Sequence, residues 1–376
     1  MDDNSLDSFN RKGPFFEGAM KLLVNGSFLM KTVKGVQRYA YELIHALSRV
    51  GFEHLRIVAP PSCTQSRLHG YEIIVDPLRI GWFGQWWLWE QLRLPSIAGK
   101  FPEWILWSPT NIGPVAVKKQ VVTLHDALVF AKPHFYGSMR MKYYRWVFRH
   151  LGRRSMLVVT DSAFSRDELI RYGIARAEKI YVVPCGVSDI FRPKQLSDKK
   201  ASTRYVLTLG SRDPRKNIAR LIDAWKMIDT RIKDKVKLVV VGGNIKSTSD
   251  DCDLGVLPAD VQVLRDEPDS SIVQLYQDCL FFIFPSLYEG FGLPPLEAMA
   301  CGAPIVVSNA ASLPELCQEA ALYFDPTDVD DIAKKMELLL CDANLRSRKR
   351  ELSIARARQY SWDTAAHKLV TALENL

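Results

Sequence analysis

The sequence predicts an α/β protein made of two doubly wound domains that face each other across a cleft. Short apolar runs of strand length alternate with amphipathic helical segments along most of the chain, which is typical of parallel sheets covered by helices. The 376 residues exceed what one ordinary domain requires. A polar stretch near residue 200 interrupts the alternation, so we expect one domain on each side of it.

The composition is that of a globular protein, with 47% apolar and 24% charged residues. The sequence lacks the long apolar run that a membrane-spanning helix requires. Its N-terminal residues lack the apolar core of a signal peptide, and its 7 cysteines show no paired spacing. We therefore expect a cytoplasmic protein with reduced thiols.

The net charge of +8 is unevenly distributed. Residues 1–195 hold 27 Lys and Arg against 16 Asp and Glu, whereas the remainder holds 23 against 26. Nucleic acid, an anionic membrane surface or a phosphate-bearing acceptor could each account for a basic first half. The sequence has no nucleic-acid-binding motif, which leaves the membrane surface and the acceptor.

The domain boundaries follow from these patterns. We expect a flexible tail at residues 1–18, the first domain at 19–193, a linker at 194–203, the second domain at 204–360 and a terminal helix at 361–376.

The first domain is predicted to contain seven strands: Met20–Gly26, His54–Ala59, Tyr71–Val75, Ile105–Ser108, Gln120–Leu124, Met156–Thr160 and Lys179–Pro184. Ligands of open α/β sheets bind at the carboxyl ends of the strands, which makes His125 and Ser162 candidates for a site. Gly35 stands where a phosphate-binding loop would have its glycine, ahead of a helix. Ser165 and Glu168 form a capping-box pattern, so we expect Ser165 to cap a helix there.

Two further segments of the first domain are rich in aromatic residues. Residues 81–94, GWFGQWWLWEQLRL, combine four tryptophans that suit either a core helix or an interface. Residues 138–154 form a basic helix whose cations include Lys142, Arg145, Arg149, Arg153 and Arg154. Such a helix either packs its apolar side on the sheet or rests on an anionic bilayer.

The second domain is predicted to begin with strand Tyr205–Leu209 and the loop GSRDPRKN, residues 210–217. Arg215 and Lys216 in this loop could pair with a diphosphate. Further strands are expected at 236–243, 261–265, 280–284, 304–308 and 321–324, with helices from 218 and at 271–279, 330–340, 345–360 and 364–376.

The stretch FPSLYEGFGLPPLEAMACG, residues 284–302, is predicted to carry the main site. A strand runs into a glycine-containing turn and then into a helix that Pro294 and Pro295 can begin. The free N–H groups and the positive dipole end of this helix suit an anion. The two carboxylates, Glu289 and Glu297, suit the hydroxyls of a sugar or a ribose.

These loops also carry a resemblance. Glu289 and Glu297 in EGFGLPPLEAMACGAPIV resemble the signature of the retaining glycosyltransferases of family 4, which have the GT-B fold. The stretches GSRDPRKN and VTLHD are similar to further motifs of that family. The segment from Cys185 to Pro193 is similar to its NGVD…F.P junction, with Cys185 and Ser188 in place of Asn and Asp. The resemblance covers about Lys21 to Leu376 and implies two Rossmann-like domains, with the terminal helix packed back on the first.

The resemblance also implies roles for individual residues. His125, Glu289 and Lys216 would form the catalytic group, with His125 under the donor sugar near its anomeric carbon. Glu297 would bind the ribose of the donor. The remaining roles are diphosphate binding by Arg215, Lys216, Ser211, Gly290, Phe291, Gly292 and Leu293, base binding by Leu264 and Arg265, and the acceptor side formed by Gly35, Val36, Asp126 and Ser162.

No metal and no cofactor are expected, because cations and a helix dipole would neutralise the leaving phosphate. The Asp251-Cys252-Asp253 triplet lacks the strand context of a metal–nucleotide site. Many relatives have Arg at the position of Ser211, so either Arg212 or Arg215 can be the partner of the diphosphate.

Relatives with PRKN and GVQRYA include bacterial mannosyltransferases of surface-polysaccharide assembly. The expected reaction moves α-mannose from GDP-mannose to a polyprenyl-diphosphate-linked oligosaccharide, in exopolysaccharide or O-antigen synthesis, at the inner face of the cytoplasmic membrane. UDP-glucose or dTDP-rhamnose as donor, a non-catalytic assembly subunit and an epimerase of similar fold are the alternatives. A Rossmann-type oxidoreductase would need a G-x-G-x-x-G after the first strand, which is absent.

Overall fold

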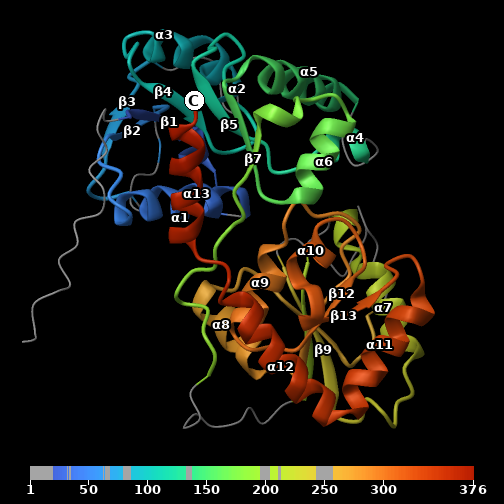
Figure 1. Ribbon diagram of the computed structural model, residues 1–376. Coiled ribbons are helices and arrows are strands. Elements are labelled where there is room, and N and C mark those ends of the chain that lie inside the picture. Colours follow the sequence, from blue (N-terminus) through green and yellow to red (C-terminus); the bar gives the residue numbers. More distant parts are fainter. Residues whose placement is uncertain are drawn as a thin grey trace, which may run out of the picture.

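The computed structural model describes residues 20–31, 33, 35–61, 63, 68–78, 86–132, 138–194, 204–210, 213–242 and 257–376. They form two α/β units, each built on one parallel sheet with helices on both sides (Figure 1). The two-domain α/β fold predicted from the sequence is therefore confirmed.

The first sheet has seven strands in the order β3-β2-β1-β4-β5-β6-β7. Every neighbouring pair is parallel. Its strands are β1 (Leu22–Asn25), β2 (Leu55–Ala59), β3 (Glu72–Val75), β4 (Ile105–Ser108), β5 (Gln120–Thr123), β6 (Leu157–Thr160) and β7 (Ile180–Val182). All residues of β1, β4, β5 and β6 are buried, as in a sheet covered on both faces.

The helices of the first domain are η1 (Gly26–Met30), α1 (Gly35–Arg49), α2 (Trp86–Leu88), η2 (Trp89–Arg93), α3 (Leu94–Ala98), α4 (Leu128–Ala131), α5 (Ser138–Arg154), α6 (Ala163–Arg171) and η4 (Ala177–Lys179). The basic helix predicted at 138–154 is confirmed as α5. In the aromatic segment Trp89 is buried and donates to Asp76, while Trp87 is part-exposed and packs edge-on against Tyr143. The segment therefore serves both the core and the surface.

The second sheet has six strands in the order β10-β9-β8-β11-β12-β13, again all parallel. Its strands are β8 (Arg204–Leu209), β9 (Val236–Val241), β10 (Val261–Leu264), β11 (Phe281–Phe284), β12 (Ile305–Ser308) and β13 (Ala321–Phe324). The helices are η5 (Pro214–Lys216), α7 (Ile218–Met227), α8 (Asp269–Asp278), α9 (Leu293–Ala300), α10 (Leu313–Cys317), η6 (Gln318–Ala320), α11 (Val329–Cys341) and α12 (Ala343–Ala357).

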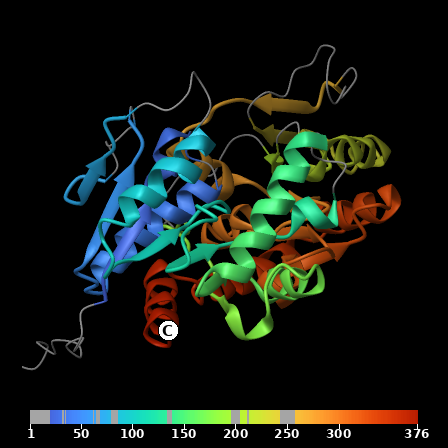
Figure 2. The same ribbon diagram turned by 90° about the horizontal axis from the view of Figure 1, so that it is seen from above.

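The last helix, α13 (Trp362–Glu374), leaves the second domain and lies along α1 of the first (Figures 1 and 2). Trp362 packs edge-on against Tyr39, and Arg49 donates to Asp363 from Nη2 at 2.6 Å. A parallel bridge pairs Val187 with Ser361 where the chain leaves the second domain.

The capping prediction for α6 was wrong. Ser162, three residues earlier than expected, is the N-cap, and its hydroxyl accepts from the N–H of Ser165 at 3.0 Å. Both serines fit the capping preference, and in the structure the hydroxyl of Ser162 is the one that accepts the backbone N–H.

Within the described residues, no helix combines the length and the apolar character needed to cross a membrane. The predicted tail at 1–18, most of the linker at 194–203 and the Asp251–Asp253 triplet lie outside the described residues.

Candidate active site

The loop between β11 and α9 has a conformation that depends on glycine. Gly292 has φ of 112°, a conformation that side-chain-bearing residues rarely adopt, and a Cβ there would lie 2.9 Å from Leu313. Pro294 and Pro295 occupy the first turn of α9, where the missing N–H groups cost no helical hydrogen bond. The loop N–H groups and that of Leu293 have no partner inside the helix and stand at its positive end.

A second loop is fastened to the first by Asn217. This residue has φ of 57° and separates η5 from α7. Its amide donates to the carbonyls of Pro285 at 3.1 Å and Pro326 at 2.8 Å. The N–H of Leu287 also donates to the Arg215 carbonyl, at 2.8 Å. Residues 213–217 and 285–292 therefore form one unit.

This unit brings the predicted cations beside the first predicted carboxylate. Lys216 Nζ donates to Glu289 Oε1 at 2.6 Å, and the Ser286 hydroxyl donates to the same oxygen at 2.6 Å. Arg215 is held by Asp213, with Nε donating to Oδ2 at 2.8 Å. Burial lowers the pKa of Arg215, but Asp213 and Glu289 outweigh it and the net shift is upward, so this cation is permanent.

Glu297, the second predicted carboxylate, is 8% exposed on α9. Its Oε2 accepts from the Tyr276 hydroxyl at 3.4 Å, and its Oε1 lies 4.0 Å from Arg38 Nε of the first domain. Burial raises the pKa of Glu297 to about 7, against the opposing effect of Arg38. This carboxylate therefore has unused capacity to accept hydrogen bonds and titrates near neutral pH.

His125, on the opposite wall, is tightly held by its own domain. Nδ1 lies 2.6 Å from Asp161 Oδ2 and Nε2 lies 3.0 Å from the Pro109 carbonyl, so both contacts are satisfied when both nitrogens carry a proton. Burial lowers the pKa of His125, but Asp161 reverses that effect and the net shift is upward. The ring is buried against Tyr39, with centroids 4.7 Å apart. The imidazole is thus a fixed group, and its placement under a donor sugar stays a prediction.

The backbone of His125 and Asp126 contacts the glycine loop of the second domain. A Cβ on Gly290 would overlap the His125 carbonyl oxygen and approach Asp126. Burial raises the pKa of Asp126, while Arg215 across the cleft lowers it.

The N-terminus of α6 completes this contact between the domains. The hydroxyls of Ser162 and Ser165 donate to the Gly290 carbonyl at 2.6 and 3.0 Å. The carboxylate of Glu315 in turn accepts from the N–H groups of Ala163 and Phe164, at 2.8 and 2.9 Å. Ser162 therefore lies in the contact between the two domains and in addition caps α6, and its acceptor-side role stays a prediction.

The remaining predicted residues are distributed around the cleft. Gly35 begins α1 next to Val36, and a Cβ on Gly35 would meet Leu293 at 3.8 Å, an ordinary contact across the domains. Leu264 ends the edge strand β10, and Arg265 follows it. Ser211 and Arg212 lie outside the described residues, so the choice between Arg212 and Arg215 stays open.

Several residues of the site were missed from the sequence. Arg38 lies one turn into α1, and its partners are more than 230 residues away along the chain. Ser312 donates to the carbonyls of Glu289 and Phe291, at 2.9 and 2.8 Å. Local patterns carry no signal for such contacts. Glu90 was detectable in principle, as the one acid in a tryptophan-rich run, and it is buried beneath Asn25 and Ser27 with Oε2 unpaired.

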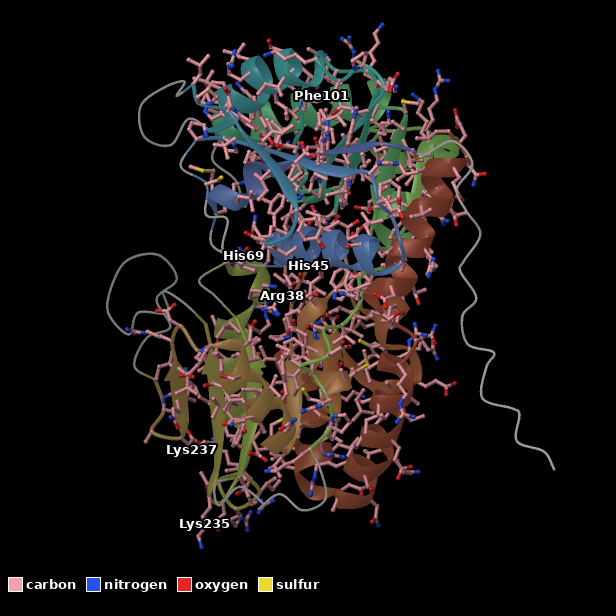
Figure 3. All side chains as sticks on the ribbon, turned by 90° about the vertical axis from the view of Figure 1, so that its left-hand side faces the viewer. Arg38, His45, His69, Phe101, Lys235 and Lys237 are labelled. Atoms are coloured by element: carbon pink, nitrogen blue, oxygen red, sulfur yellow. The ribbon has the colours of Figure 1, made fainter. Side chains whose placement is uncertain are left out.

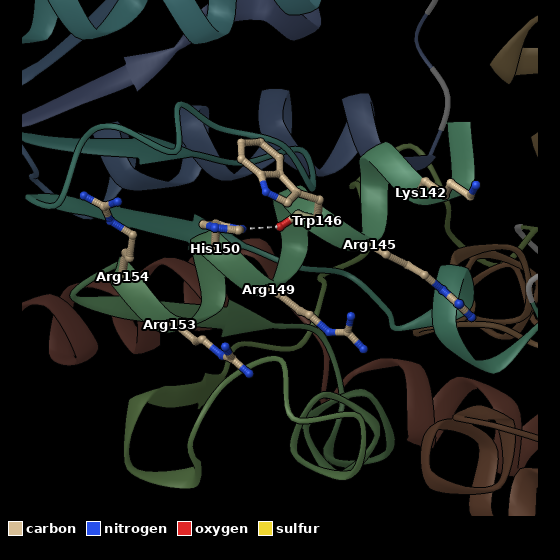
Figure 4. Close-up of a pocket in the computed structure, with 7 residues that line it drawn as sticks. All are labelled: Lys142, Arg145, Trp146, Arg149, His150, Arg153 and Arg154. Carbon is tan, nitrogen blue, oxygen red and sulfur yellow. Dashed lines mark hydrogen bonds between the residues drawn. The ribbon is translucent and has the colours of Figure 1, made fainter. Parts of the chain in front are cut away.

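The outer face of the first domain carries a basic pocket of about 450 Å³ on α5 (Figure 4). Its lining residues are Lys142, Arg145, Trp146, Arg149, His150, Arg153 and Arg154. No carboxylate of the described residues lies within 4.0 Å of the Lys and Arg nitrogens of this group. Figure 4 shows Arg145, Arg149 and Arg153 extending to one side of the helix and Trp146 to the other.

Residues 33–189 match the profile described as Glycosyltransferase Family 4, and residues 189–356 match that described as Glycosyl transferases group 1. The O-antigen chain mannosyltransferase B of Escherichia coli is 31% identical over 276 residues, which cover 70% of this chain and 72% of that protein. The serotype-specific mannosyltransferase WbdA of Escherichia coli is 28% identical over 69% of this chain, but this match spans only 34% of that longer protein.

Among solved structures, Anabaena Alr3699/HepE in complex with UDP and glucose superimposes with a TM-score of 0.73. The two chains are 20% identical, and the match covers 95% of this chain and 100% of that one. This likeness concerns the fold alone.

Proposed function

This chain belongs to the family 4 glycosyltransferases and has their GT-B fold, and from the site we propose a retaining transfer of α-mannose from GDP-mannose to a lipid-linked saccharide. The family and its O-antigen relatives support a glycosyltransferase of polysaccharide synthesis.

One observation carries the proposal. The loops at 213–217 and 285–292 are fastened together and bring Arg215, Lys216 and Glu289 to the N-terminus of α9, facing the first domain. Cations and free N–H groups stabilise negative charge that grows on a departing diphosphate, which is stabilisation specific to the transition state. In this proposal Glu289 accepts from hydroxyls of the sugar and Glu297 from those of the ribose.

The proposed reaction breaks the bond between the anomeric carbon and the phosphate oxygen and forms one to the acceptor oxygen on the same face. The acceptor proton moves to the departing phosphate. Glu289 already shares one oxygen with Lys216 and Ser286, which supports a binding role for it over that of a covalent nucleophile. A double displacement through a carboxylate is the alternative. The anomeric configuration of the first-formed product, read by NMR, tests retention, and a β-linked product from an α-linked donor would refute it.

We expect transfer to proceed without a metal ion, because Arg215, Lys216 and the α9 dipole neutralise the leaving group. Nucleotide release that persists in excess EDTA is the expected result, and loss of release that Mg²⁺ restores would contradict it.

Mannose is favoured by the relatives. The O-antigen chain mannosyltransferase B of Escherichia coli and the O-antigen chain mannosyltransferase RfbU of Salmonella typhimurium are both mannosyltransferases. The fold neighbour solved with UDP and glucose keeps UDP-glucose as an alternative donor, beside dTDP-rhamnose. Nucleotide release measured with GDP-mannose, UDP-glucose and dTDP-rhamnose decides among them. Release from a UDP-sugar alone would end the mannose proposal, and binding without release from any donor would favour a non-catalytic assembly subunit.

The acceptor is proposed to be a polyprenyl-diphosphate-linked saccharide reached from the inner face of the cytoplasmic membrane. The basic pocket of α5 supports this, because its exposed cations suit an anionic lipid surface. One face of the first domain would then contact the lipid, and another would face the donor.

A further inference from the structure

Arg38 connects the two domains at the ribose end of the proposed donor site. It projects from α1 of the first domain toward the second (Figure 3). Its Nη2 donates to Asp269 Oδ1 at 2.7 Å, at the start of α8, and its Nε lies 4.0 Å from Glu297 Oε1 on α9. Its guanidinium also lies over the ring of Phe191, 5.8 Å from the centroid. One side chain is thus fixed by groups from both domains.

The charges around Glu297 are mostly negative. Glu42 of α1 and Asp269 of α8 oppose its ionisation, and so does its burial. Arg38 and the Tyr276 hydroxyl favour the carboxylate form, and Cys301 also lies within its field. On the α12 side, Arg350 lies against Gly302, just beyond the end of α9. Of these groups, Arg38 is the cation within ion-pair distance of the carboxylate.

We propose that Arg38, from the first domain, is a positioning residue of the donor site, which favours the ionised form of Glu297 and orients it to accept hydrogen bonds from the hydroxyls of the nucleotide ribose. This inference rests on the proposed function of Glu297. An ionised carboxylate accepts hydrogen bonds at both oxygens, whereas a protonated one loses part of that capacity and donates instead. Donor binding then requires the first domain to be closed on the second, because the residue that maintains the acceptor belongs to the other domain.

A purely structural role for Arg38 predicts different behaviour. Arg49, on the same helix, also pairs with a carboxylate of a distant segment, Asp363, at 2.6 Å. That pair is half-exposed and includes no residue of the glycine loop, so Arg49 is the matched control. If Arg38 only fastens the domains, its removal should weaken binding equally at every pH.

The test measures nucleotide affinity by calorimetry between pH 6 and 9 for the wild type, Arg38→Gln, Arg38→Lys and Arg49→Gln. The probes are GDP, UDP and dTDP, and the comparison uses the one that the wild type binds most tightly. Loss of the Arg38 cation raises the pKa of Glu297 further above its present value of about 7. We therefore expect Arg38→Gln to bind about tenfold more weakly at pH 7 and to approach the wild type by pH 9. Arg38→Lys should recover part of the loss at pH 7, and Arg49→Gln should match the wild type throughout.

The outcomes separate this inference from the proposed function. If the wild type binds none of the three nucleotides, the proposed donor site is refuted. The inference about Arg38 is then refuted as well. If the wild type binds and Arg38→Gln weakens binding by the same factor at every pH, or not at all, the inference alone is overturned. Thermal unfolding of each variant confirms that the comparison concerns folded protein.

Discussion

Replacing Glu297 by Gln should stabilise the protein at alkaline pH while it weakens donor binding. The carboxyl is buried, and its pKa rises from the ordinary 4.5 to about 7 in the fold. Because the folded state binds this proton more tightly than the unfolded chain, the contribution to stability is complete below pH 4.5 and is lost as pH rises through 7. That difference amounts to about 3 kcal/mol, since one pKa unit corresponds to about 1.4 kcal/mol.

Glutamine has the same shape and no charge to desolvate, and Arg38 keeps its partner Asp269. Urea unfolding at a series of pH values should therefore give equal stabilities for variant and wild type near pH 4. The variant should be more stable by about 3 kcal/mol at pH 8, or roughly 6–12 °C in Tm for a domain of this size.

The same substitution at Glu319, an exposed residue of the second domain, is the control and should leave the wild-type pH dependence unchanged. A difference between Glu297→Gln and the wild type that is constant with pH, or a variant less stable at pH 8, would refute the reasoning.

Three further predictions concern other parts of the cleft and its surroundings. Lys216→Ala removes the cation bonded to Glu289 and should lower kcat/KM for nucleotide release by about 10²–10³, as loss of one transition-state donor does. Gly290→Ala places a methyl group against the carbonyl of the facing domain and should reduce kcat at least tenfold, with a lower Tm. Arg153→Gln with Arg154→Gln should weaken sedimentation with phosphatidylglycerol vesicles roughly thirtyfold, because each surface cation contributes about 1 kcal/mol.

Each of these predictions has a matched control. For the lysine it is Lys226→Ala on α7, which forms an exposed pair with Asp223. For the glycine it is Gly99→Ala, where the nearest atoms lie at 3.4 Å or beyond. For the two arginines of α5 the control is Lys235→Gln with Lys237→Gln, two lysines at the far end of the second domain (Figure 3). Vesicles of phosphatidylcholine serve as the lipid control. If a control variant shows the same effect as the variant it is matched to, the cause given for that effect is wrong.

The sequence predicted most of the secondary structure, because local periodicity determines it. The bounds of α5 were predicted as observed, and α9 begins where glycine and proline chemistry places it. The site was only partly predictable. The cations and carboxylates were indicated by the chemistry of their loops and by the resemblance, but the hydrogen bond of Lys216 to Glu289 joins residues 73 apart. Arg38 and Glu315 act through partners in the other domain, and no local pattern signals such contacts.

The chain passes between the domains twice, and the two passages touch. The segment after β7 and the segment before α13 meet in the Val187–Ser361 bridge, and the backbone of Trp362 lies so close to Gly186 that a Cβ there would overlap it. Two connections that lie side by side would make a hinge with a defined axis. Such a hinge would allow the two domains to rotate apart about that axis and would restrict sliding and twisting. Every cycle of opening would then return Gly290 to the same place between Ser162 and Ser165.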